Sequence, residues 1–132
     1  MKSALIVVAD PAIRLMLLRI LGRYGWWVDA VESVENALAF LGKVPRHVVL
    51  IDWKIESGSG LSLLMAIRMH PVWQSIPAIM MHDDAALAEV ERALELGAND
   101  FLAHAFTGEA ALGTLDRWVL DKTEPTGCEL VG

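Results

Sequence analysis

The sequence predicts an α/β fold in which helices cover both faces of a doubly wound, five-stranded parallel sheet. Five short apolar runs rich in β-branched residues alternate with five longer segments of helical periodicity. The short runs are apolar at nearly every position, which is typical of strands buried on both faces. Strict alternation of strands and helices indicates parallel strands joined by crossover helices.

Length and charge limit the possible functions. The chain has 132 residues and a formal net charge of -6. We expect one domain over residues 1–120, with a flexible polar tail or linker over residues 121–132. Nucleic-acid binding needs clustered Lys and Arg residues. The negative net charge therefore argues against such binding by this domain. No apolar run approaches the roughly 20 residues of a membrane span. The single Cys128 excludes an internal disulfide, and a cytoplasmic setting fits best.

The first helix follows a strand over residues 4–9. Asp10 is the expected N-cap and Pro11 the first helical residue of a helix that runs to about residue 24. Its core positions are predicted to be Ile13, Met16, Leu17, Ile20 and Leu21. Leu15 and Leu18 fall on the opposite side. Leucines on a face that is usually polar suggest a partner surface.

The next elements are a strand over residues 26–31 and a short helix capped by Ser33. Alternation along the strand places one of Trp26 and Trp27 in the core and the other outside. A third strand then ends at Asp52, and a loop follows it to residue 59. His47, at the start of this strand, is expected at the surface.

The second half repeats the alternation. Helices are predicted over residues 60–69, 84–96 and 107–120, and strands over residues 76–82 and 101–103. Gly97 is placed to end the fourth helix in a left-handed conformation. His70, at the end of the third helix, is expected at the surface.

Polar residues follow the carboxyl ends of these strands, where open α/β sheets place their sites. Asp10 follows the first strand, Asp52 ends the third, His82 and Asp83 follow the fourth, and His104 follows the fifth. We expect Asp52, His82 and His104 to converge on one pocket, with Asp10 or Asp83 nearby.

The order and spacing of several motifs resemble those of a CheY-like response-regulator receiver domain. The motifs are Asp10-Pro-Ala-Ile-Arg14, Ile51-Asp52 with Gly60 eight residues later, Ile76-Pro-Ala-Ile-Met80, and Gly97-Ala-Asn-Asp-Phe-Leu102 followed by Phe106. The resemblance covers about residues 4 to 120. It implies a flavodoxin-like (βα)5 receiver fold. It also matches Asp52 to the phosphoacceptor aspartate and Phe101 to the switch aromatic.

The sequence departs from the family at most other pocket positions. The family holds Mg²⁺ with an acidic pair after the first strand, where this chain has Val8 and Ala9. His82 replaces a Ser or Thr, His104 replaces a lysine, and Ala105 replaces a proline. We therefore expect a degenerate pseudo-receiver in which Mg²⁺ binding is weak or lost, since this ion prefers oxygen ligands.

Three functional hypotheses remain. The first is a non-enzymatic signalling module that contacts a histidine kinase, a phosphotransfer protein or an output domain, with a homodimer also possible. In this case Asp52 would be a vestigial, partly solvated carboxylate. The second is a functional phosphoacceptor at Asp52. The third is a metal or pH sensor that uses Asp52, His82 and His104.

Overall fold

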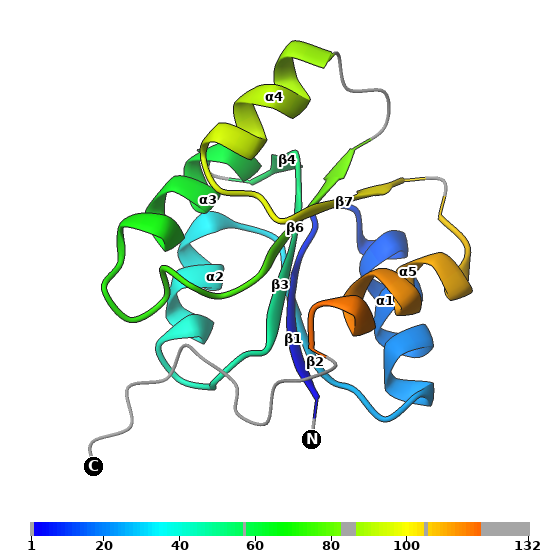
Figure 1. Ribbon diagram of the computed structural model, residues 1–132. Helices are drawn as coiled ribbons and strands as arrows, with labels where there is room; N and C mark the ends of the chain where they lie inside the picture. The colour runs from blue at the N-terminus through cyan, green and yellow to red at the C-terminus, as the bar shows by residue number, and fades with distance from the viewer. Residues whose placement is uncertain (1, 57, 83–86, 105, 120–132) are drawn as a thin grey trace.

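The computed structural model describes residues 2–56, 58–82, 87–104 and 106–119 and confirms the predicted fold (Figure 1). The main sheet has five parallel strands in the order β2-β1-β3-β6-β7. Its strands are β1 (Ser3–Val7), β2 (Trp27–Val31), β3 (Val48–Asp52), β6 (Ala78–His82) and β7 (Asp100–Ala103). The helices are α1 (Pro11–Arg23), α2 (Val34–Leu41), α3 (Gly60–Met69), α4 (Leu87–Glu95) and α5 (Gly108–Arg117). The predicted tail over residues 121–132, Asp83 and Ala105 lie outside the described residues.

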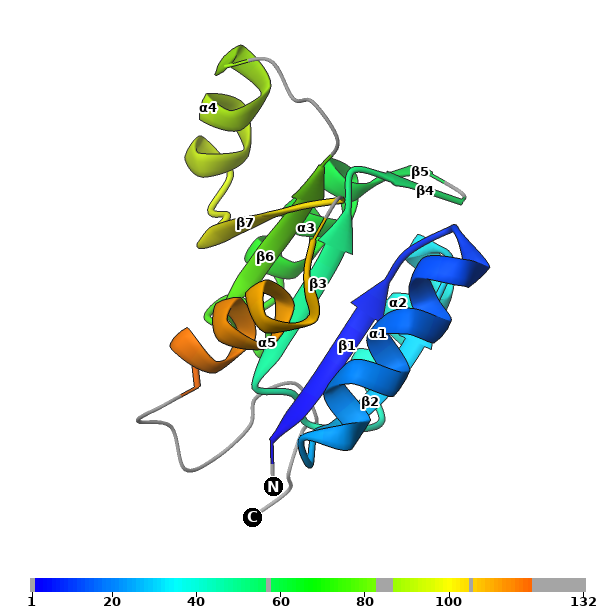
Figure 2. The same ribbon diagram turned by 90° about the vertical axis from the view of Figure 1, so that its right-hand side faces the viewer.

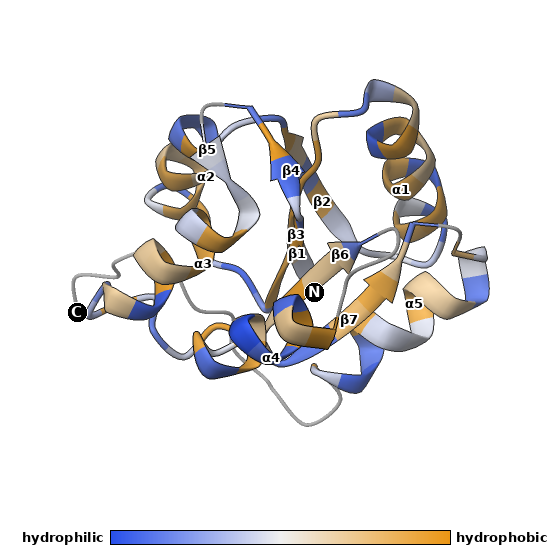
Figure 3. Ribbon diagram, turned by 90° about the horizontal axis from the view of Figure 1, so that it is seen from above, coloured by the Kyte–Doolittle hydropathy of each residue, from blue (hydrophilic) through white to orange (hydrophobic). Residues whose placement is uncertain are grey.

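Two hydrophobic clusters fill the two faces of the sheet. One joins odd-numbered positions of β1 and β3 to residues of α2, α3 and α4. The other joins even-numbered positions of the same strands to residues of α1 and α5. Seen from above, α2 and α3 accordingly lie on one side of the sheet and α1 and α5 on the other (Figure 3). The alternation of side chains along each strand therefore decides which layer of helices each residue contacts.

The helices begin where the sequence supplies N-caps. Asp10 accepts a hydrogen bond from the backbone N–H of Ala12, at 2.8 Å, and Pro11 is the first residue of α1, as predicted. Ser33 and Thr107 cap α2 and α5 in the same way. At α3, Ser59 and Ser62 form a reciprocal capping box.

The apolar pattern of α1 was interpreted only in part correctly. Leu17 and Leu21 are buried, but Met16, predicted in the core, has 46% of its surface exposed. Leu15 is exposed as expected, whereas Leu18 is half-buried. The core side of the helix is therefore narrower than the sequence suggested, because α1 packs mainly along one row of side chains three to four residues apart.

The tryptophan pair at β2 follows the predicted alternation. Trp26 lies in the core on the α1 and α5 side, and Trp27 is exposed. Two histidine predictions differ from the structure. His47 is buried, not at the surface, and its Nδ1 accepts a hydrogen bond from the backbone N–H of Ser3 at 3.0 Å. His70 is half-buried because its ring stacks on Trp73 at 3.7 Å between centroids.

A fully buried arginine just before β3 joins β1 and β2 at the amino end of the sheet. Arg46 Nη2 lies 2.6 Å from Asp29 Oδ2 of β2, and Nη1 donates to the carbonyl oxygen of Ala4 in β1 at 3.1 Å. A buried cation needs such partners, because an unpaired charge in the interior is strongly unfavourable. The ion pair fixes the base of the sheet, at the end opposite Asp52.

A second arginine joins α3 to the turn after α4. Arg68 donates to the carbonyl oxygens of Gly97, at 3.0 Å, and Ile76, at 2.8 Å, and to Asn99 Oδ1 at 2.8 Å. Its burial lowers the pKa of the guanidinium from the usual value. Gly97 has φ 102°, which confirms the predicted left-handed residue after α4.

The segment after Asp52 is not the simple loop that was predicted. It forms a small antiparallel hairpin of β4 (Lys54–Ile55) and β5 (Gly58–Ser59). Glu56 in its turn pairs with Ser33, and its N–H donates to the carbonyl oxygen of Glu32 at 2.9 Å. These contacts hold the hairpin, which follows β3, against the residues just before α2. No helix within the described ranges is long and apolar enough to cross a membrane.

Candidate functional site

β3 lies between β1 and β6 in the sheet (Figure 2). Asp52 is the last residue of β3 and is buried. Gly60, the first residue of α3, lies directly against its backbone. A Cβ atom at position 60 would lie 2.2 Å from the carbonyl oxygen of Asp52, so only glycine fits. This close approach explains the eight-residue spacing between the two residues. The Asp52 residue is 4% exposed, so its carboxylate is buried and not partly solvated as we had considered.

The Asp52 side chain forms a hydrogen bond with a histidine from the other side of β6. Nε2 of His104 lies 2.8 Å from Oδ1 of Asp52. The Asp52 side chain has 6% of its surface exposed and that of His104 has 20%. His104 therefore covers the carboxylate from the solvent side. The backbone N–H of Lys54 makes a longer contact with the same oxygen, at 3.4 Å.

His82 does not join this pair, so the predicted convergence of Asp52, His82 and His104 is wrong. Asp52 pairs in register with Met81, which belongs to the α1 and α5 side of the core. His82 is the next residue and points to the opposite face, the side of Met80. There its ring meets Phe101 edge-on, with centroids 5.9 Å apart and an interplanar angle of 69°.

The end of β1 carries a cation where the family places two carboxylates. Val8 is buried in the core and Ala9 is half-buried. Nη1 of Arg14 donates to the carbonyl oxygen of Val8 at 2.8 Å and to that of Ala9 at 2.7 Å. Asp10, expected near the pocket, is exposed and uses its carboxylate to cap α1.

The sequence analysis did not assign Arg14 a role in this site. The available signal was its position one helical turn after the N-cap. From there a long side chain can reach back to the strand end.

The part of the chain that the structure describes forms no three-ligand metal site. No group of three or more His, Cys, Asp and Glu side chains among the described residues could hold a metal ion. Asp52 and His104 supply two of the suggested ligands, and His82 lies on the other face. The arrangement instead pairs a buried carboxylate with an imidazole, which can neutralise it when protonated.

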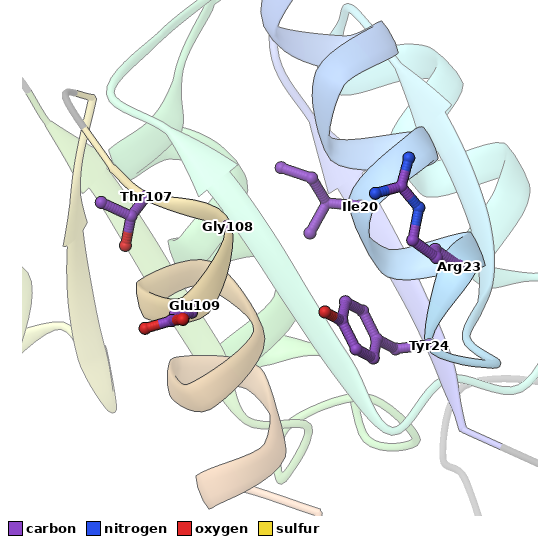
Figure 4. A pocket seen from close by; sticks show the side chains of 6 residues that line it. All are labelled: Ile20, Arg23, Tyr24, Thr107, Gly108 and Glu109. Atoms are coloured by element: carbon purple, nitrogen blue, oxygen red, sulfur yellow. The ribbon is translucent and has the colours of Figure 1, made fainter.

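A pocket of about 470 Å³ lies between α1 and α5, away from Asp52 (Figure 4). It is lined by Ile20, Arg23, Tyr24, Thr107, Gly108 and Glu109. Ile20 and Tyr24 extend toward α5, the Arg23 guanidinium lies beside Ile20 along α1, and Thr107 and Glu109 lie on the α5 side (Figure 4). The polar groups of this pocket therefore do not converge on a common point. In a typical small-molecule site they do.

Comparisons with known proteins place this geometry in context. The family model described as "Response regulator receiver domain" matches residues 4–115. The phosphate regulon transcriptional regulatory protein PhoB of Klebsiella pneumoniae is 26% identical over 132 residues, covering 99% of this chain and 57% of that protein. The chain thus spans little more than half the length of this relative.

Shorter relatives match over most of their length. The probable chemotaxis protein CheY of Rhizobium etli is 30% identical over 110 residues, covering 82% of this chain and 85% of that protein. Among solved structures, the chemotaxis protein CheY4 of Vibrio cholerae superposes with a TM-score of 0.85 at 25% identity, covering 89% of this chain and 98% of that one.

Proposed function

The chain belongs to the response-regulator receiver family of two-component signalling, and we propose that it acts through protein–protein contacts with little or no Mg²⁺-dependent phosphorylation of Asp52. The observation that carries this proposal is the hydrogen bond of 2.8 Å between Asp52 and His104. It engages Oδ1, one of the two oxygens of a buried carboxylate, with which a metal ion or a phosphoryl donor would have to compete.

Electrostatics at the neighbouring strand supports the proposal. Phosphoryl transfer to a carboxylate brings two anions together, and Mg²⁺ normally reduces their repulsion. Mg²⁺ prefers an octahedral set of oxygen ligands, including carboxylates. Here Val8 and Ala9 offer no side-chain oxygen, and the guanidinium of Arg14 already binds their two carbonyl groups. A divalent cation at the end of β1 would therefore find no side-chain oxygen ligand there. It would also lie beside the positive charge of Arg14.

The proposed partners are a histidine kinase, a phosphotransfer protein or an output domain, which are the partners of receiver domains. Leu15 and Met16 form an exposed apolar patch on α1, with Leu18 half-buried beside it. Exposed apolar side chains on one helix face favour a protein interface. We place the partner contact there, and we propose a non-enzymatic role for the domain.

The proposal is tested by titrating the protein with Mg²⁺ and beryllofluoride while backbone amide shifts are followed by NMR. We expect no saturable shift at Asp52 or Phe101. A saturable shift that disappears in Asp52→Asn would overturn the proposal in favour of a functional phosphoacceptor. The matched control is Asp10→Asn, which changes an exposed carboxylate at the same edge and should leave any such response intact.

A further inference from the structure

Two contacts hold β7 on its two faces. On the α1 and α5 side, His104 follows β7 directly and bonds Asp52 of β3 at 2.8 Å. On the other side, the ring of His82 in β6 meets Phe101 of β7 edge-on at 5.9 Å. Between them, the backbone N–H of His104 donates to the carbonyl oxygen of His82 at 2.8 Å.

Burial makes these contacts restrictive. Phe101 is half-buried and packs against the core on the α2 and α3 side. Nδ1 of His82 is buried and has no hydrogen-bond partner among the described residues. In the described part of the chain, the His82 ring packs edge-on against Phe101.

From this geometry we infer that His82 and His104 fix β7 and the Phe101 ring in one conformation that does not respond to phosphorylation. The inference rests on the proposed function, because it replaces a switch by a permanent contact. Edge-to-face aromatic contacts are favourable beyond the burial of the two rings and bias the rotamer equilibrium by about two- to tenfold. His82 acts as a positioning residue for Phe101, and His104 anchors the strand end to Asp52.

β7 is an edge strand of the described sheet. With Phe101 fixed, this edge keeps the same form before and after any upstream signal.

The test is NMR of the protein labelled with ¹³C-phenylalanine, with Phe101 assigned through Phe101→Leu. We expect a single χ1 rotamer for Phe101 in the unsubstituted protein. In His82→Ser we expect a second rotamer or exchange broadening of the Phe101 signal. His70→Ala removes another histidine that stacks on an aromatic ring, away from this edge, and should leave Phe101 unchanged.

Two outcomes would overturn the inference. One is rotamer averaging of Phe101 in the unsubstituted protein, which needs no variant to fold. The other is a folded His82→Ser protein whose Phe101 signal is unchanged. Failure of the proposed function looks different, because it requires a beryllofluoride response that depends on Asp52. A Phe101 signal that is fixed in the free protein and moves with beryllofluoride would refute both.

Discussion

Asp52 and His104 are joined by a hydrogen bond of 2.8 Å although 52 positions separate them in the chain and β6 lies between their strands. The contact spans β6 because both side chains extend past the carboxyl edge of the sheet on the same face. The Asp52 carboxylate is thereby bonded to a side chain of the protein itself. The chemistry of Asp52 therefore depends on whether this internal bond can be displaced.

The strength of the bond can be measured with a double-mutant cycle of Asp52→Ala and His104→Ala. Hydrogen bonds to charged groups contribute about 1.5–3 kcal/mol, and both side chains here are mostly buried. We expect a coupling free energy of about 1–3 kcal/mol, from urea unfolding of the four proteins. Additive effects of the two substitutions would mean that the bond contributes nothing to stability.

Gly60 gives a second prediction, with a matched control in α1. Alanine usually stabilises a helix relative to glycine by about 0.5–1 kcal/mol. Gly22→Ala should show this gain, because nothing lies within 4 Å of its added Cβ. Gly60→Ala should instead lower the free energy of unfolding by about 1–3 kcal/mol, because its Cβ would meet the Asp52 carbonyl. Thermal or urea unfolding distinguishes the signs, and equal effects at both positions would contradict the close approach.

The strands and helices could be predicted because they depend on local patterns. β1, β3 and β6 are continuous apolar runs, and Asp10 and Ser33 are side chains that cap helices through contacts within three residues. The hairpin after Asp52 was not predicted. Its two-residue strands carry no periodic pattern, and it is held partly by the contact of Glu56 with Ser33 far away in the chain.

The site could be predicted only to the level of strand ends. The pairing of Asp52 with His104 follows from their strands ending at one edge, but the placement of His82 required the register. Asp52 lies opposite Met81, so His82, the next residue, falls on the other face of the sheet. The sequence of one strand does not reveal this register between two strands. The burial of Arg46 and His47 was missed for a similar reason, since their partners come from β1 and β2.

Arg46 leads to a third prediction, on two salt bridges whose carboxylates are about equally exposed and whose cations are not. Asp29 and Asp116 have nearly equal side-chain exposure, 29% and 30%. Their cations differ, because Arg46 is 0% exposed and Lys2 is 46% exposed. Asp29→Ala leaves a buried charge without its carboxylate, and we expect a loss of about 3 kcal/mol. Asp116→Ala should cost less than about 1 kcal/mol.

Urea unfolding of the two variants checks this comparison. The double variant Asp29→Ala with Arg46→Met should recover part of the loss, because it removes the buried charge and keeps much of the side-chain volume. Equal losses for Asp29→Ala and Asp116→Ala would show that burial of the cation does not decide the energy.

The last prediction concerns a metal ion. Ala9 is half-buried at the edge of the sheet, whereas Val8 is buried in the core, so position 9 has more room for a carboxylate. We expect Ala9→Asp to gain Mg²⁺ binding, because it adds an oxygen ligand next to Asp52. Mg²⁺ should then raise the Tm of this variant, by an amount equivalent to about 2.7 kcal/mol at a hundred times the Kd. The unsubstituted protein and Ala9→Asn should show no such rise.

The bond to His104 should oppose this gain, since Mg²⁺ must compete with the imidazole for Asp52. Ala9→Asp with His104→Ala should therefore bind Mg²⁺ more tightly than Ala9→Asp alone, and adding Asp52→Asn should abolish binding. If His104→Ala leaves the Mg²⁺ affinity of Ala9→Asp unchanged, the imidazole does not restrict access to Asp52. In that case the missing carboxylates alone would account for the weak Mg²⁺ binding that we propose.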